Sequence, residues 1–240
     1  MALSKTQFCE IKKLLETAST HKGSLRWIDQ PGDLVFTAPT HVADPNCHYV
    51  VMGYNPGGNA DVSKQKKLCD TIKSLQSNDG DGSDDGNIAG WSKVMKARFA
   101  AIKKVMGDSS FVGEPTGVNL FPYPSSGINE FMAKTSKCGC SIEDMFKSMW
   151  PVHEYILKQT SAKILLTLGY GLRNSVFALL KQHYKVDSFC FEEHGVRAFR
   201  MPKTDLQLRY VIGLHHIAWR DVNKKSLCAC IRECEKQSLH

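Results

Sequence analysis

Three short segments place polar side chains directly after apolar runs. Asn55 follows the apolar residues 49–51, Asn119 ends a second such run, and His215 and His216 end a third. An amide can hold a water molecule through its carbonyl oxygen or pair with a polar ring edge, and an imidazole can stabilise developing negative charge through a hydrogen bond. The residue types therefore favour a site that binds a polar ligand and stabilises an anion.

The first of these segments is a glycine-rich turn, residues 52–58, which reads Met-Gly-Tyr-Asn-Pro-Gly-Gly. Pro56 fixes one backbone angle, and Gly57 and Gly58 allow a close approach or a positive φ. Ligands of open α/β sheets bind outside the carboxyl ends of the strands, so this turn is a candidate site. The alternative is an ordinary Asn-Pro-Gly turn in which Asn55 only satisfies backbone groups.

The elements that must position these residues follow from hydrophobic periodicity. Pro151 should kink or divide the helix that contains it. Continuously apolar strands separated by helices predict an α/β fold of three layers, with a central, mostly parallel sheet flanked by helices. We expect a single domain over residues 1–240, with an acidic Gly/Asp-rich loop at about 77–90. The predicted helices are 7–18, 63–76, 91–106, 141–160, 174–182 and 222–236, and the predicted strands are 34–37, 48–53, 116–121, 163–168, 188–191, 196–200 and 210–214.

The composition is that of an ordinary globular protein, with 42% hydrophobic and 23% charged residues. The net charge of +7 permits attraction to phosphates. The nine cysteines are odd in number and lie mostly in apolar or helical patterns, which favours free thiols and an intracellular, reducing setting, cytoplasmic or nuclear. No apolar run approaches the roughly 20 residues of a membrane span, and no signal peptide is visible, so we expect no membrane partner.

The order of the three segments resembles that of the uracil-DNA glycosylase superfamily, closest to its mismatch-specific and single-strand-selective monofunctional branches. Residues 53–57 look like the first family motif, and residues 118–120 are similar to the strand whose asparagine reads the flipped base. Residues 150–169 resemble the helix and strand that end in a Leu-Gly turn. Residues 214–218 occupy the place of the second motif, usually His-Pro-Ser-Pro, from which Pro-Ser-Pro is absent here. The likeness spans about residues 48–225.

This resemblance implies a monofunctional DNA glycosylase that hydrolyses the N-glycosidic bond of a flipped uracil or 5-modified pyrimidine and leaves an abasic site. Asn55 would position the water and Asn119 would read the base, unless it only satisfies backbone groups. His215 or His216 would stabilise the anionic base, and the register favours His215. No lysine lies in the three segments 53–57, 118–120 and 214–218, so we expect hydrolysis without a Schiff base. We expect DNA as the partner, no cofactor and a monomer, acting in base repair or against modified foreign DNA.

The resemblance also assigns a base pocket and DNA contacts. Gly57 stands where strict uracil enzymes carry a bulky tyrosine, which implies a pocket open to 5-substituted pyrimidines. Residues 58–76 contain no aromatic residue to stack on the base. Trp219 would wedge the base stack, or else pack against the last helix. One of the pocket aromatics would replace the missing stacking residue. The pocket residues are Gly53, Tyr54, Gly57, Asn119, Phe121 and Tyr123. The DNA contacts are Ser125, Ser126, Trp219 and Arg220.

Two further signals are set aside, and two rival functions stay open. An EF-hand-like run from Asp81 has Ser92 where a glutamate ligand is needed. The cysteines 138, 140, 228, 230 and 234 lack the spacing of an iron–sulfur cluster, so we predict no metal. The first rival is a catalytically decayed nucleic-acid-binding protein of the same fold, and the second is a small-molecule nucleoside hydrolase.

Overall fold

The computed structural model describes residues 4–19, 47–54, 93–111, 116–123, 128–137, 139–171, 173–215 and 220–238. Within these ranges, one six-stranded sheet has the strand order β2-β1-β3-β6-β5-β4. Its first three strand pairs are parallel, and β5 and β4 follow antiparallel to their neighbours. The strands are β1 (Tyr49–Gly53), β2 (Thr116–Asn119), β3 (Ile164–Leu168), β4 (Phe191–Glu193), β5 (Val196–Arg200) and β6 (Tyr210–Leu214).

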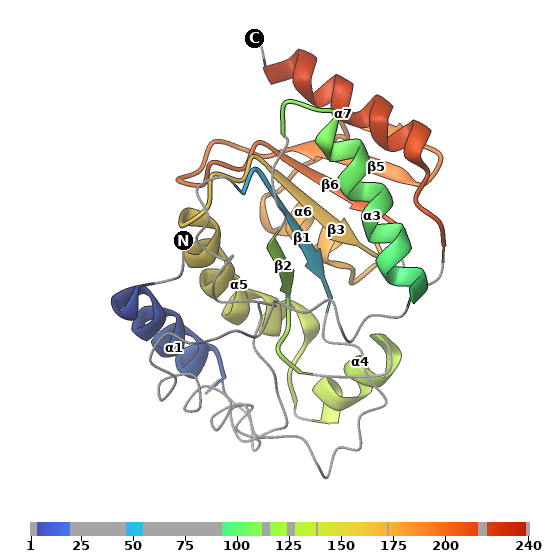
Figure 1. The fold of residues 1–240 in the computed structure, drawn as a ribbon. Coiled ribbons are helices and arrows are strands. Elements are labelled where there is room, and N and C mark those ends of the chain that lie inside the picture. The colour runs from blue at the N-terminus through green and yellow to red at the C-terminus, as the bar shows by residue number, and fades with distance from the viewer. Residues whose placement is uncertain are drawn as a thin grey trace.

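Helices cover both faces of this sheet. In Figure 1, α3 and α7 lie together over one face, and α6 lies behind the strands. Two core clusters correspond to these layers: one joins the sheet to α3 and α7, and the other joins it to α1, α4, α5 and α6. The expected three-layer, mostly parallel α/β fold is confirmed. The helices are α1 (Lys5–Ser19), α3 (Lys93–Gly107), α4 (Ile128–Lys137), α5 (Ile142–Lys158), α6 (Val176–His183) and α7 (Lys224–Ser238).

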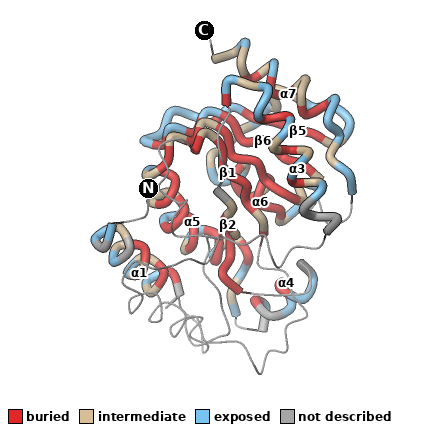
Figure 2. Tube along the Cα trace, in the orientation of Figure 1, coloured by how far each residue is buried: buried red, intermediate tan, exposed pale blue. Residues whose placement is uncertain are grey.

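The central strands are buried on both faces, which Figure 2 shows as a continuous red band through the sheet. Every residue of β3 and β6 is buried, so these strands carry no polar face. This is why they appear in the sequence as unbroken apolar runs. The strand expected at 188–191 is found instead as β4 at Phe191–Glu193. The sequence misplaces it because the residues of β4 are partly or fully exposed and carry no clear apolar pattern.

Helix α5 runs through Pro151 as one helix, so the expected division at this residue is wrong. Pro151 is exposed, so the carbonyl that it leaves without a helical partner belongs to the solvent-facing side, where water can bond it. The helix begins at a true cap, since the Ser141 hydroxyl accepts a hydrogen bond from the Asp144 N–H at 3.0 Å. Helix α4 was not predicted, and it is short, with Phe131 and Thr135 as buried contacts.

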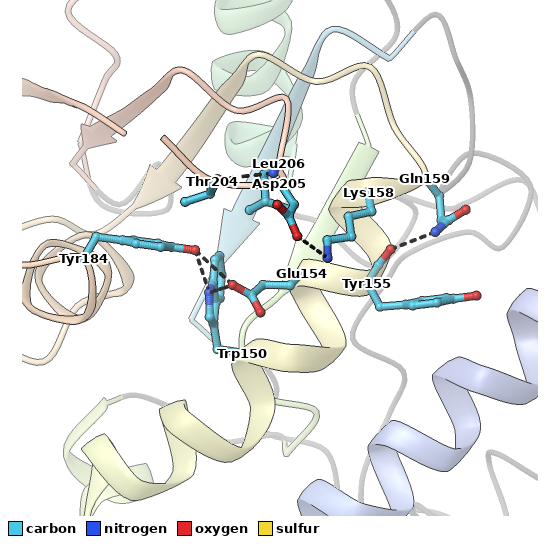
Figure 3. A network of polar contacts seen from close by, with 9 residues as sticks. All are labelled: Trp150, Glu154, Tyr155, Lys158, Gln159, Tyr184, Thr204, Asp205 and Leu206. Carbon is cyan, nitrogen blue, oxygen red and sulfur yellow. Dashed lines mark hydrogen bonds and ion pairs between the residues drawn. The ribbon is translucent and has the colours of Figure 1, made fainter. Parts of the chain in front are cut away.

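A polar network ties α5 to the end of α6 (Figure 3). The Trp150 indole N–H donates to the Tyr184 hydroxyl at 2.9 Å and to Glu154 Oε1 at 3.1 Å. The Tyr184 hydroxyl also donates to Glu154 Oε1 at 3.2 Å. The buried indole therefore has its polar atom satisfied, as a buried tryptophan requires.

Several predictions of the sequence lie outside the described residues. They are the strand at 34–37, the helix at 63–76 and the acidic loop at about 77–90. The assignment of residues 1–240 to a single domain stays a prediction. Among the helices that the structure describes, none is both long and apolar enough to cross a lipid bilayer.

Close packing around Gly213 generates a stability prediction. A Cβ on Gly213 would lie 2.7 Å from the Tyr170 Cβ and 2.8 Å from the Phe177 Cδ2. Replacing Gly213 by alanine should therefore lower the free energy of unfolding by about 1–3 kcal/mol, because overpacking forces neighbours to move. Urea denaturation followed by circular dichroism measures this change.

The control is Gly107→Ala at the end of α3, where an added Cβ meets nothing within 4 Å. This variant should be unchanged or slightly stabilised, by up to about 1 kcal/mol. Equal stability of the Gly213→Ala and wild-type proteins would contradict the close packing.

Candidate active site

The candidate site lies at the edge of the sheet where the four parallel strands end. Because β1, β2, β3 and β6 run in the same direction, the residues that end or follow them share this edge. Gly53 and Asn119 are the last residues of β1 and β2, and Gly169 and His215 follow β3 and β6. The edge is the place that the sequence analysis expected to carry the site.

Asn119 lies directly across the end of β1. It is in register with Gly53, and its Oδ1 lies only 2.8 Å from where a Cβ on Gly53 would be. A side chain at position 53 would collide with the amide, so the glycine permits this placement. The pairing continues beyond the strands, since the N–H groups of Leu120 and Phe121 donate to the carbonyls of Gly53 and Tyr54, each at 2.9 Å. The amide of Asn119 is thereby held beside the segment that leads into Asn55.

The predicted pocket aromatics pack into the core on the side of α4 and α5. Tyr54, Phe121 and Tyr123 are all buried. Tyr54 meets Phe121 edge-on at 5.1 Å between ring centroids and meets Phe131 of α4 at 5.4 Å. Burial, followed by the charge of Glu143, raises the pKa of Tyr54, so its hydroxyl stays protonated. These contacts make the rings a support beneath the edge, and their stacking on a base stays a prediction.

His153 of α5 fixes the chain just after Asn119, and the sequence analysis missed it. Its Nε2 lies 2.8 Å from the Leu120 carbonyl oxygen, which can only accept, so Nε2 carries the proton. The ring is fully buried, and this burial lowers the pKa of His153 to about 4, although the bond to Leu120 opposes the shift. The available signal was its helical spacing from Met149 and Ile156 on the buried face of α5.

His153 makes the stability of the protein pH-dependent. An unfolded histidine binds a proton near pH 6.5, whereas the buried His153 does so only near pH 4. Between these values the unfolded state holds more protons, so stability is complete above about pH 6.5 and falls as the pH drops toward 4. This group alone should remove roughly 3 kcal/mol across that range.

Unfolding free energies at several pH values, for the wild type and for His153→Gln, test this contribution. Glutamine keeps a donor for the Leu120 carbonyl but does not titrate, so its curve should be flatter between pH 6.5 and 4. Parallel curves for the two proteins would show that His153 does not control the acid sensitivity.

His215 lies in a slot between a tyrosine ring and a glycine turn. Its ring centroid is 4.9 Å from that of Tyr170, and a Cβ on Gly195 would lie 2.7 Å from the imidazole Cδ2 and 2.8 Å from its Nε2. Gly195 and His194 form the two-residue turn between β4 and β5, with φ of 89° and 38°. This turn type requires positive φ at both residues. Asn223 donates to the His194 carbonyl at 3.3 Å and so holds the turn against the start of α7.

The electrostatic setting of His215 favours the neutral ring. Partial burial, followed by the charge of Arg220, lowers the pKa of His215. A neutral imidazole donates from one nitrogen and can stabilise an anion without transferring a proton. Arg220 is exposed. The next residue, Asp221, pairs with Arg98 of α3 at 2.7 Å, which ties this segment to the helical layer of α3 and α7.

An arginine stacked on aromatic rings lies near His215, because both residues contact Tyr170. The Arg197 guanidinium lies 5.2 Å from the Tyr170 ring centroid and 5.4 Å from that of Phe189. Its Nη2 also pairs with Glu192 Oε1 at 2.6 Å. Tyr170 thus has His215 and Arg197 as neighbours, and cation–π contact fixes the arginine. Sequence reasoning missed both Tyr170 and Arg197, because their approach depends on the β5–β6 register.

Asn119 and His215 do not touch each other. The strands β1 and β3 stand between them, and three strand spacings of about 4.8 Å separate the two positions by roughly 14 Å. Strand alternation sends Asn119 toward the face of α3 and α7, whereas His215 lies with Tyr170 on the face of α6. A ligand that reaches both must therefore lie across the edge, over the ends of β1 and β3.

The remaining predicted site residues lie outside the described residues. They are Asn55, Gly57, Ser125, Ser126, His216 and Trp219.

Within the described ranges, no group of three or more histidine, cysteine or acidic side chains could hold a metal ion. The cysteines near α7 are free thiols, and a hydrogen bond with Cys234, followed by burial, raises the pKa of the partly buried Cys190 thiol.

Comparisons of the chain with models of known protein families and with curated proteins found no match.

The slot around His215 can be tested with a pair of glycine variants. Gly195→Ala should push the imidazole out of place and shift the His215 ring resonances in a two-dimensional NMR spectrum, because the added methyl group occupies the ring's position. The positive φ should also cost about 1–2 kcal/mol of stability. Gly139→Ala is the matched control, since Gly139 has φ of 67° and nothing within 4 Å of an added Cβ. Equal His215 spectra in both variants would contradict the slot.

Proposed function

We propose that this chain is a monofunctional DNA glycosylase that hydrolyses the N-glycosidic bond of a flipped uracil or 5-modified pyrimidine. The observation that carries the proposal is the register pairing of Gly53 with Asn119, with the amide oxygen over the glycine. It holds the amide that would read the base beside Gly53, two residues before Asn55 in the chain. The resemblance to the uracil-DNA glycosylase superfamily supports the same assignment.

In this mechanism the two amides and the imidazole have separate tasks. Asn119 offers both a donor and an acceptor, which suits the polar edge of a pyrimidine. Asn55 would hold water through its carbonyl oxygen below C1′. The water oxygen bonds to C1′ while the glycosidic bond breaks, its electron pair leaves with the base, and the proton lost by the water passes to solvent or to the released base. His215 would stabilise the anionic base by a hydrogen bond from its neutral ring.

The separation of Asn119 and His215 specifies how the base would lie. Three strand spacings of about 4.8 Å place the two strands roughly 14 Å apart, and the two side chains with their hydrogen bonds to the base take up part of this distance. The flipped nucleotide would therefore lie across the ends of β1 and β3, with one edge of the base toward Asn119 and the other toward the ring of His215. Gly57 would leave space for a 5-substituent. The partner would be DNA and the setting repair or defence, in an intracellular monomer without a cofactor.

The second candidate is a nucleic-acid-binding protein of the same fold without catalysis. Two observations favour it: Asn119 and His215 leave the edge on different faces, and the chain carries a net charge of +7. Such a protein would bind DNA through phosphates with strong salt dependence. It would lose little function when the amides are removed.

Abasic-site formation on labelled oligonucleotides tests the proposal. The substrates are single- and double-stranded and carry uracil, mispaired thymine, 5-hydroxymethyluracil, or hydroxymethylated or glucosylated cytosine. We expect cleavage of at least one substrate, and Asn55→Ala, Asn119→Ala and His215→Ala should each lower its rate roughly 100-fold or more. His194→Asn is the matched control, because His194 is an exposed histidine of the adjacent turn and asparagine tolerates its positive φ.

Three outcomes would overturn the proposal. Unchanged rates in all three variants would remove the assigned residues from catalysis. Absence of cleavage together with salt-dependent DNA binding would establish the binding protein. Salt-insensitive turnover of free nucleosides would instead indicate a small-molecule hydrolase.

A further inference from the structure

A hollow lies at the opposite end of the sheet from the candidate active site. It is formed where β5 ends and where β3 and β6 begin, together with the connection from β5 to β6 and the end of α7. Its volume is about 580 Å³. The strands between the two ends are five residues long, so roughly 16 Å of sheet separates this hollow from the other edge. It is lined by Lys163, Arg200, Met201, Pro202, Lys203, Thr204, Leu206, Gln207, Leu208, Arg209, Tyr210 and Ser238.

The charge of this lining is entirely positive. It contains two lysines and two arginines and no acidic residue. Among the described residues, none of these four cations forms an ion pair. The carboxylate of the connection, Asp205, pairs instead with Lys158 of α5 at 3.6 Å (Figure 3) and does not line the hollow. Four like charges around one small space make a positive potential that attracts an anion.

The walls of the hollow are held by hydrogen bonds and by buried side chains. The Met201 N–H donates to the Arg209 carbonyl, and the Arg209 N–H donates to the Lys163 carbonyl, each at 2.8 Å. Leu206 and Leu208 are buried and anchor the connection. The backbone that carries the cations is therefore fixed, which reduces the part of the ordering cost of binding that comes from the main chain.

The chemistry of the lining suits a phosphate attached to an apolar or aromatic body. Arginine forks and lysine ammonium groups are the side chains that bind phosphoryl oxygens. Hydroxyls of Ser238 and Tyr210, 3.5 Å apart, lie beside them, and Pro202 and Met201 offer apolar contact. The volume falls within the range of small-molecule pockets, about 300–1,000 Å³. A hollow of this volume fits a small ligand better than the long backbone of a nucleic acid.

We propose that this basic hollow binds a nucleoside polyphosphate, with the phosphoryl groups held by Arg200, Arg209, Lys163 and Lys203. The site is independent of the candidate active site and of the chemistry proposed there. The base and sugar would lie against the apolar part of the lining.

Isothermal titration calorimetry at physiological ionic strength, with the full chain, tests this site. The probes are adenosine triphosphate, inorganic tripolyphosphate and a 12-nucleotide single strand of DNA. We expect saturable binding of the nucleoside triphosphate that is tighter than that of tripolyphosphate. The Arg200→Ala/Arg209→Ala double variant should weaken this binding at least tenfold. Asn119→Ala should bind the nucleotide as the wild type does, which separates this site from the proposed active site.

The matched control is Lys104→Ala/Arg232→Ala, which removes two exposed positive charges that do not line the hollow. It should leave nucleotide binding unchanged. Amide NMR shifts of the wild type give a second reading that needs no variant, and they should concentrate in residues 200–210 on addition of the triphosphate. Equal weakening in both double variants, shifts elsewhere in the chain, or binding of the oligonucleotide alone would overturn the proposal.

Discussion

The position of β1 between β2 and β3, parallel to both, is the constraint on which the rest of the structure depends. It brings the ends of strands that are far apart in the chain to one edge, and it buries both faces of the central strands. Because those strands have no polar face, polar side chains can be presented only where a strand stops. Gly53, Asn119 and His215 occupy such positions, so the location of the candidate site follows from the sheet itself.

The supports of the site are provided by the two helical layers. On one side, His153 of α5 bonds the Leu120 carbonyl and fixes the chain after Asn119. On the other, Asn223 at the start of α7 bonds the turn that carries Gly195, against which the His215 ring lies. The two halves of the edge are therefore held by hydrogen bonds from different helices.

The sequence predicts the parts of the fold that have a strong periodic pattern. The strands β3 and β6 are unbroken apolar runs, and α5 has a pronounced buried face, so their existence and type were predictable. Strand β4 was placed three residues too early because its exposed residues carry no such pattern. The contact of Asn119 with Gly53, and that of His215 with Tyr170, depend on the register of strands distant in sequence, which no local pattern encodes.

The two parts of this sheet differ in how far apart their partners lie along the chain. The strands β4, β5 and β6 follow one another and pair with their immediate neighbours, so their contacts close only short loops. The pairing of Tyr49 with Ile164 joins positions more than 100 residues apart. Loop-closure entropy makes such long-range pairing slow. The strands β4, β5 and β6 are thus the part able to form first during folding. Strand β1, with the glycine-rich turn after it, would then pair with strands that are already formed.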